Sequence, residues 1–459
     1  FVIAMLATVG MAACSKDDTA PAAGPKKYVQ VTIPENAASG ETRTSVDGTT
    51  TSWVAGYKVA VSLYNGSTTE VCEFTVDRTG ATTTFSGSVP VGSYTCAAVH
   101  YPFCAATFDA VNKTFTHTWG DAYCSTDLAA YDFMFSTVYE TPFVVDETTT
   151  VLPIALTFRP LMARIGMKLA LGANETPKYV TFTTDDNVLP TAGTVNADGT
   201  FSASALTNSL TVETDRKEFT VGLLPVGVAS KMSVHVTTTD GMTYSDKSFQ
   251  LAGLKRNTHY TMNVPCRTKR FMLTVPDGVN SKYGTGTYGD NGFFQVEPQY
   301  DPESIFDGWH FLRSEIKSDK DAADGDVLKN RNRIQLQAVS LGTNRAQNGA
   351  FVTPPIQCDG TKTVTVSFTA ATNKLTVGSV QYRIGVTNNG ADISEDFLRS
   401  FDNIQSSLEG ECPWKHSGSV SRTHTFTVTN GQRIMMKVYS SGGGTPCHLE
   451  LADFTYTVE

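Results

Sequence analysis

The sequence of 459 residues has few charged residues and no excess of positive charge. Charged residues make up 18% of the chain, and 45 acidic against 36 basic residues give a net charge of -9. A nucleic-acid-binding protein needs a basic surface to neutralise phosphates, so the composition argues against that function. Hydrophobic residues make up 40% of the chain, which excludes a disordered protein because such chains bury too little apolar surface. The length predicts several domains.

The sequence also lacks the local motifs of common enzymes and metal sites. Eight histidines are scattered along the chain, and none belongs to a His-Glu-x-x-His motif. Gly-x-Ser-x-Gly and Walker motifs are absent, as is the CxxC spacing of zinc and thioredoxin sites. We therefore predict that the protein is not an enzyme and needs no cofactor. Paired carboxylates for glycoside hydrolysis need to meet only in space, so that alternative stays open.

The first residues predict export. Residues 1–13 form an uncharged apolar run that is too short to span a bilayer, and we interpret them as a truncated signal peptide. Ala12 and Ala13 precede Cys14, as in the lipobox of bacterial lipoproteins, so we expect lipid on Cys14 and a flexible tether over residues 14–27. The alternative is an ordinary signal peptide with an incidental cysteine. Eight other cysteines permit disulfides in an exported protein, or remain buried free thiols.

Short runs of β-branched and aromatic residues alternate with turn residues from residue 28 onward. Dipeptides such as Asn65-Gly66 and Asp240-Gly241 between these runs suit tight hairpins. Residues 394–408 carry apolar side chains at three- and four-residue steps and predict one short helix. The sequence therefore predicts an all-β chain of stacked sandwiches. The period-two pattern predicts strands at 28–33, 58–64, 72–76, 94–100, 180–184, 231–237 and 259–264.

Two breaks divide this pattern into three predicted domains. One break follows the polar loop at residues 147–150, and the other is a basic linker at residues 267–270 that we expect to lack strand structure. We therefore expect a β-sandwich over residues 28–150 and a second over residues 151–266. The last segment, residues 271–459, is large enough for an eight-stranded jelly roll.

Three patterns carry a family resemblance. Residues 41–45 read ETRTS and residues 53–61 read WVAGYKVAV. Tyr57 departs from the pattern of the family named below, which usually has Asp at this position. Residues 156–165 (LTFRPLMARI) and 257–264 (NTHYTMNV) follow in the order of a second domain's opening and closing strands. In this respect residues 14–266 resemble fimbrillin-like proteins, the lipoprotein pilins of Bacteroidales-type bacteria.

The resemblance implies two tandem fimbrillin-type β-sandwiches that assemble by strand exchange. In this family an arginine-specific protease removes the N-terminal strand, and a strand of another subunit fills the groove. An open sheet edge favours such complementation. Here residues 28–33 correspond to the removed strand and Arg43 to the cleavage site; the alternative for Arg43 is an ordinary solvated loop arginine.

The C-terminal third resembles a different family. Its patterns at residues 329–336, 350–356, 362–368 and 447–456 resemble galactose-binding-like jelly rolls, which commonly bind carbohydrate. Sugar binding needs flat apolar faces beside polar groups. The aromatic candidates for that role are Trp414, Trp309 and Tyr288, with core packing as the alternative for each. Weak candidates for calcium ligands are Asp319, Asp321, Asp324 and Asp326, which otherwise form a solvated acidic loop.

Together these patterns predict a fimbrial subunit or adhesin at the bacterial cell surface, anchored in the outer membrane through Cys14. Its expected partners are other pilin subunits, and host or dietary glycans or proteins, but not nucleic acid. In the family the donor strand typically comes from the C-terminal end, yet residues 449–458 are expected within their own domain. A subunit that accepts a strand and donates none ends a filament, so we expect a tip subunit. The alternative is a standalone surface lipoprotein that captures polysaccharide and does not polymerise.

Overall fold

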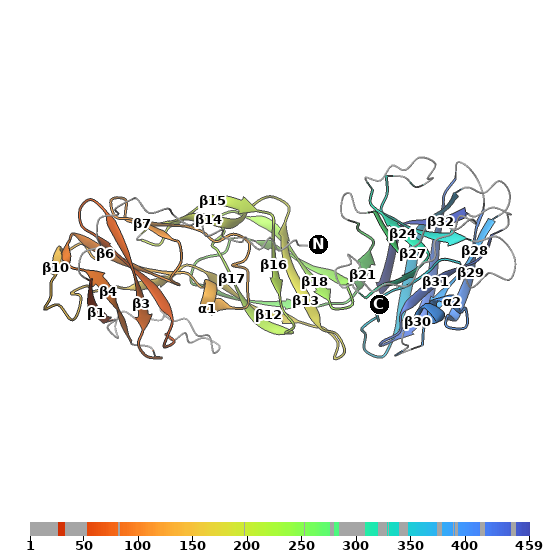
Figure 1. The fold of residues 1–459 in the computed structure, drawn as a ribbon, viewed down its shortest axis with the longest axis horizontal. Helices are drawn as coiled ribbons and strands as arrows, with labels where there is room; N and C mark the ends of the chain where they lie inside the picture. Colours follow the sequence, from red (N-terminus) through yellow and green to blue (C-terminus); the bar gives the residue numbers. More distant parts are fainter. Residues whose placement is uncertain are drawn as a thin grey trace, which may run out of the picture.

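The computed structural model has three β-rich bodies in a row (Figure 1). Helix is confined, in the described residues, to α1 (Leu128–Tyr131) and α2 (Glu395–Arg399). The all-β prediction is therefore confirmed. The structure describes residues 26–32, 53–80, 83–196, 198–251, 253–275, 280–283, 308–319, 328, 330–338, 348–373, 379–388, 390, 393–413, 418–441 and 447–459.

The first body packs a long antiparallel sheet around Trp53. The Trp53 ring lies 5.0 Å from the ring of Phe85 and 5.2 Å from that of Phe158, edge to face. Because Phe158 belongs to this core, the first body extends beyond the boundary expected at residue 150. The sheet order is β1 (Lys26–Thr32), β4 (Thr84–Pro90), β3 (Thr69–Val76), β2 (Lys58–Tyr64), β6 (Cys96–Tyr101), β9 (Met134–Ser136) and β11 (Phe158–Pro160), and a second small sheet pairs β5 (Gly92–Tyr94) with β10 (Phe143–Val145).

The second body contains three sets of paired strands around one core. Two of its strands come from the part of the chain expected in the first domain, because Phe108 and Phe115 pack into this second core. The first two bodies therefore share residues rather than meeting at one boundary. The strand orders are β16 (Ser209–Glu213), β13 (Pro177–Thr184), β18 (Ser230–Thr238) and β19 (Thr243–Leu251); β17 (Glu218–Leu223), β12 (Ala163–Leu169) and β20 (His259–Val264); and β15 (Phe201–Thr207), β14 (Leu189–Asn196), β8 (Thr114–Thr118) and β7 (Thr107–Asp109).

The C-terminal body is a sandwich of two sheets with a shared hydrophobic core. Its inward side chains, such as Val366 and Leu451 from one sheet and Ile384 from the other, are 0% exposed. The predicted helix over 394–408 is wrong in length: α2 ends at Arg399, and β29 (Gln405–Pro413) follows. One sheet orders β22 (Asn280–Tyr283), β24 (Ser314–Lys317), β25 (Arg333–Ala338), β32 (Cys447–Val458), β27 (Thr361–Asn373) and β30 (Val420–Thr429); the other orders β23 (His310–Leu312), β26 (Ala350–Val352), β31 (Ile434–Ser441), β28 (Ser379–Val386) and β29.

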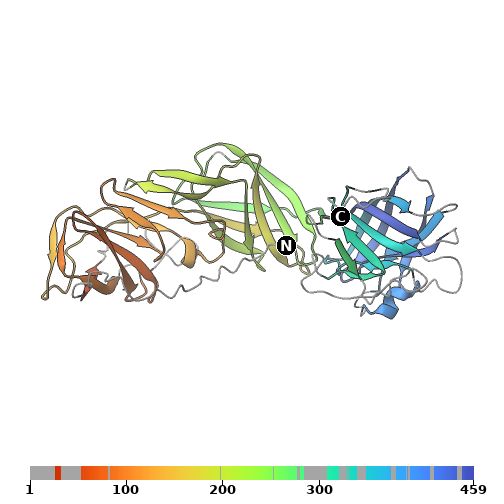
Figure 2. The same cartoon turned by 45° about the horizontal axis from the view of Figure 1, so that its top comes forward.

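The junction between the second and the C-terminal body is itself a strand. Residues Lys269–Met272 form β21, where Lys269 pairs with Tyr244 of β19 on one side and with Val458 of β32 on the other. One sheet therefore continues from the second body into the C-terminal sandwich. Figure 2 shows these two bodies next to each other along the length of the molecule. The prediction of a linker without strand structure at residues 267–270 is wrong. The basic side chain that suggested a solvated linker, Lys269, is instead 1% exposed.

The cysteines whose side chains the structure describes are free thiols rather than disulfides. Most of them are buried, and burial raises the pKa of Cys72 and Cys412 to about 11. A thiol with a raised pKa carries little thiolate at neutral pH and is unreactive. Of the two alternatives open from the sequence, buried free thiols describe this part of the chain.

Candidate functional site

The strand β1 lies at the edge of the first sheet. It pairs along its whole length with β4, from Lys26 opposite Pro90 to Thr32 opposite Thr84. On its other side, Gln30 alone has backbone hydrogen bonds to described residues: its N–H donates to the Thr150 carbonyl at 2.9 Å, and its carbonyl accepts from the N–H of Leu152 at 2.8 Å. The N-terminal strand thus lies between β4 and the segment around residue 151.

The alternation of the sequence KKYVQVT explains how β1 is held. Val29 and Val31 face the core and are 0% and 1% exposed. Tyr28 points away from the core and is 62% exposed. Opposite Val29 stands Gly87, and a Cβ there would lie 2.5 Å from Cδ2 of Phe74. Glycine at this position therefore allows the Phe74 ring to pack closely beside the groove that β1 fills.

Few interactions hold β1 apart from its backbone ladder. Burial of a valine side chain contributes about 1.5–3 kcal/mol, and β1 buries two of them. Its described side-chain hydrogen bonds are from Lys27 Nζ to the Glu147 carbonyl at 2.7 Å and from Gln30 Nε2 to Ser86 Oγ at 3.2 Å. A competing strand with two apolar side chains at the same spacing can reproduce most of this stabilisation.

The last strand of the chain, β32, lies in the interior of its sheet. It pairs with β25 and β21 on one side and with β27 on the other. Leu449, Leu451 and Phe454 are each 0% exposed. The expectation that this run belongs to its own domain is confirmed, because removing β32 would divide one sheet and open the core.

A buried ionic network joins the second body to the C-terminal sandwich at β21. Lys269 Nζ lies 2.7 Å from Asp240 Oδ2 and 2.9 Å from Glu175 Oε1, and it also donates to the Gln357 carbonyl. The Gln357 N–H donates to the same Asp240 oxygen at 3.0 Å, and Tyr244 OH donates to Glu175 Oε1 at 2.6 Å. Because Gln357 belongs to the C-terminal sandwich, the network links four separate segments of the chain.

Comparison with protein families assigns the part of the chain between β1 and the C-terminal sandwich. A family model described as fimbrillin-like matches residues 42–276. The chain belongs to the fimbrillin-like family. The match ends just after β21, so most of the C-terminal sandwich lies outside the fimbrillin-like region. This family is one of fimbrial proteins.

Solved structures resemble the fimbrillin-like protein over about half its length. A proposed cell adhesion protein from Bacteroides ovatus is 15% identical, with 52% of this chain and 92% of that chain covered and a TM-score of 0.31. The tip fimbrial protein Mfa3 from Porphyromonas gingivalis is 13% identical, with 55% and 96% covered and a TM-score of 0.29. The fimbrial anchor protein Mfa2 from the same species is 14% identical, with 50% and 83% covered and a TM-score of 0.26. No curated protein matches the sequence.

Most of the site residues predicted from the sequence fall outside the described part of the chain. These are Cys14, Arg43, Tyr288, Trp414, Asp321, Asp324 and Asp326. They therefore remain predictions, as do the lipid anchor and the cleavage site that depend on Cys14 and Arg43.

Trp309 and Asp319 are the predicted site residues that the structure describes, and Trp309 lies in the C-terminal core. Its indole is 4% exposed and stacks on Phe311 at 5.7 Å, with Phe271 at 5.1 Å and Phe351 at 5.5 Å. A ring enclosed in this way offers no open face to a sugar. Core packing, the alternative named for every aromatic candidate, describes Trp309.

Asp319 is half-buried, and its backbone N–H donates to Asn332 Oδ1 at 3.2 Å. The described residues contain no group of three or more His, Cys, Asp or Glu side chains placed to hold a metal ion. No helix in the described ranges is long and apolar enough to cross a membrane.

Sequence reasoning missed the Lys269 network entirely. Its members lie at positions 175, 240, 269 and 357, and no local pattern connects them. The one available signal was Asp240-Gly241, a hairpin turn whose aspartate was interpreted only as a turn residue.

Proposed function

We propose that this fimbrillin-like protein is a tip subunit of a cell-surface fimbria, which accepts a strand from a neighbouring subunit in place of β1. The position of β1 is the observation that carries this proposal. It is an edge strand with two buried valines, and it is followed by a segment containing Arg43. Cleavage after Arg43 would leave β1 held only by non-covalent contacts.

The position of β32 supports the tip assignment. A stalk subunit has to donate a strand as well as accept one. Here the final strand is central to its own sandwich, and its release would expose side chains such as Leu449 and Phe454 at about 25 cal/mol per Å² of apolar surface. A strand held in this way is not available as a donor.

The C-terminal sandwich would then be the binding head at the end of the fimbria. It is joined to the fimbrillin-like region at β21, where Lys269 lies. Its strand order β25-β32-β27-β30 in one sheet and β26-β31-β28-β29 in the other supports the proposal that it is a jelly roll. The ligands we propose are glycans or proteins of the host or the diet. Trp414 remains the aromatic candidate for a sugar contact, and lipid on Cys14 would place the precursor at the outer membrane.

The deciding experiment cleaves the purified protein with an arginine-specific protease and adds a stalk pilin with a free donor strand. We expect a one-to-one complex by native mass spectrometry, loss of the β1 peptide, and no homopolymer. Arg43→Lys is the matched control because it keeps the charge but removes the cleavage site. Ladders of the cleaved protein alone on an unboiled denaturing gel would overturn the tip assignment.

The competing function is a standalone glycan-binding lipoprotein. It predicts that protein taken from the native cell surface keeps lipid at Cys14 and an uncut chain, whereas the tip function predicts a mature N-terminus at Thr44. N-terminal sequencing and intact mass together distinguish the two.

A further inference from the structure

The second body has an open sheet edge at β15, far from β1 in the fold (Figure 1). Strand β15 pairs with β14 on one side, and its other edge has no strand partner among the described residues. Residues 202–206 are all exposed, with the sequence SASAL. Proteins usually protect an edge strand with lysine, proline or inward-pointing charges, and β15 has none of these residues. Its backbone N–H and C=O groups are therefore available to an added strand.

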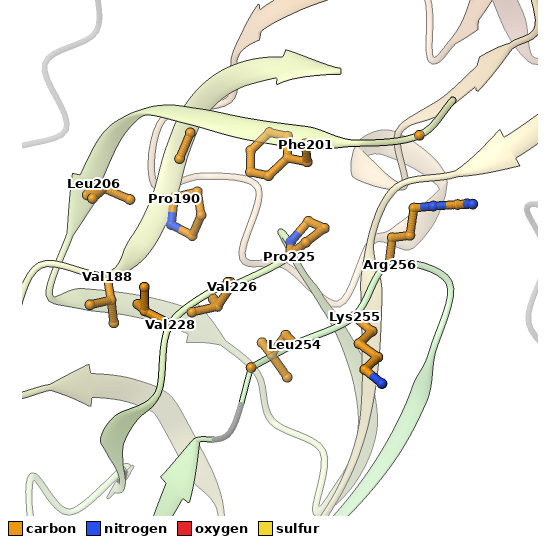
Figure 3. Close-up of a pocket in the computed structure, with 14 residues that line it drawn as sticks. Val188, Pro190, Phe201, Leu206, Pro225, Val226, Val228, Leu254, Lys255 and Arg256 are labelled. Carbon is orange, nitrogen blue, oxygen red and sulfur yellow. The ribbon is translucent and has the colours of Figure 1, made fainter. Parts of the chain in front are cut away.

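An apolar groove runs along this strand. Its volume is about 510 Å³, and Figure 3 shows that β15 lies on one side of it and two loops on the other. The loops are held to each other by paired backbone hydrogen bonds of 3.0 Å between Val226 and Leu254. The apolar lining includes Val188, Phe201, Leu206, Pro225, Val226 and Leu254.

At one end of the groove lies an arginine, Arg256, with one nitrogen that lacks a hydrogen-bond partner among the described residues. The Nη1 of Arg256 is buried and has no hydrogen-bond partner in the described part of the chain, and no ion pair of Arg256 is found there either. The guanidinium packs over the turn at Gly199, where a Cβ would lie 2.7 Å from Arg256 Nε. A buried donor without a partner costs about 1–3 kcal/mol, so a carboxylate placed at this end of the groove would gain a charge-assisted bond.

From these observations we propose that the groove beside β15 is a second strand-accepting site. Its occupant is an extended segment of another protein, with apolar side chains at alternate positions and a carboxylate near its C-terminal end. The segment adds to the free edge of β15 and buries its apolar side chains against Leu206 and Val228, which are 48% and 53% exposed. Its carboxylate pairs with Arg256. This mode of binding needs no removal of β1.

The direction of the segment follows from the position of Arg256. Strand β15 begins at Phe201, close to the Gly199 turn and Arg256, and ends near Leu206 and Val228 at the far end of the groove (Figure 3). Antiparallel pairing, the more stable arrangement, places the C-terminal end of the added strand beside Phe201. That geometry brings a C-terminal carboxylate, or an acidic side chain near it, to Arg256.

The test uses the uncut full-length protein, in which β1 stays in place. A negative result would therefore contradict this proposal without contradicting strand exchange at β1. The probe is a fluorescein-labelled peptide of alternating threonine and valine that ends in aspartate. We expect saturable binding by fluorescence anisotropy. Arg256→Gln should weaken it about tenfold or more, because a charge-assisted bond of at least 1.4 kcal/mol is lost. Ala203→Glu, at an exposed position that lines the groove, should abolish it by repulsion. The matched control Arg216→Gln, at an exposed arginine outside the groove, should change nothing.

Two further measurements separate strand addition from unspecific apolar binding. Only every second amide of an added edge strand donates to its neighbour. Of two probe peptides N-methylated at alternating amides, one should therefore lose binding and the other keep it. Equal binding of both, no binding of the parent peptide, or binding unaffected by Arg256→Gln would overturn the proposal. A concentration-dependent dimer in sedimentation velocity that Ala203→Glu abolishes would assign the groove to a second copy of this chain, and would overturn it too.

Discussion

The ammonium group of Lys269 lies 2.7 Å from Oδ2 of Asp240, and both side chains are 1% exposed. Two carboxylates surround this single cation, since Glu175 Oε1 is 2.9 Å from the same nitrogen. Thr238 and Tyr244 hydroxyls donate to these carboxylates at 2.5 and 2.6 Å. The network therefore satisfies its buried charges by hydrogen bonds, and it lies where the fimbrillin-like region meets the C-terminal sandwich.

Removing the cation should destabilise the junction strongly. In Lys269→Met the two carboxylates remain buried without a counter-charge, and we expect a loss of about 3–5 kcal/mol in the free energy of unfolding. Urea denaturation followed by fluorescence measures it. The matched control is Lys168→Met, which breaks a pair with Glu218 at a similar distance of 2.8 Å but with both side chains about two-thirds exposed. That variant should unfold at the same urea concentration as the wild type; equal losses in the two variants would contradict the prediction.

Local pattern explains why some elements were predicted well and others were not. The strands predicted at 58–64 and 259–264 coincide with β2 and β20, because alternation within a strand needs no knowledge of its partners. The linker at 267–270 failed for the opposite reason. Burial of Lys269 depends on carboxylates and a carbonyl up to 94 residues away in the sequence, at 175, 240 and 357. The boundary at 150 failed similarly, since Phe158 joins the first core only through tertiary packing.

A second prediction concerns acid. His100 is 0% exposed, with its ring between those of Phe115 at 5.9 Å and Phe133 at 5.7 Å, and burial lowers its pKa from 6.5 to about 4. As the pH falls, the unfolded chain therefore takes up a proton on this histidine at a higher pH than the folded protein does. The contribution of the neutral imidazole to the free energy of unfolding is fully present above about pH 6.5. It is lost as the pH falls to about 4, by about 3 kcal/mol in total.

Urea denaturation at several values between pH 7 and pH 4 measures this slope. His100→Gln should flatten it, whatever its effect on stability at neutral pH. His259→Gln, at an exposed histidine, serves as the control and should leave the slope unchanged. An unaltered slope in the His100 variant would show that other groups account for the acid sensitivity.

Trp309 provides a test of core against ligand contact. Because its indole packs against Phe311 and Phe351 inside the C-terminal sandwich, Trp309→Ala should cost about 3–5 kcal/mol of stability. Trp309→Phe, which keeps an aromatic ring in the core, should cost less. Thermal denaturation ranks the two variants. A Trp309→Ala protein with unchanged stability but weaker binding on a glycan array would restore this residue as a ligand contact.

The last prediction concerns release of β1 after cleavage at Arg43. Val29 and Val31 supply the buried side chains of the strand, and each contributes about 1.5–3 kcal/mol to its retention. Replacing either by serine should therefore speed loss of the β1 peptide from the cleaved protein about tenfold or more, as followed by native mass spectrometry. Tyr28→Ser is the matched control because that side chain, in the same strand, is 62% exposed, and it should leave the rate of release almost unchanged. If all three variants released β1 at the wild-type rate, the buried valines would not control retention, and strand exchange would have to be limited by the backbone ladder with β4.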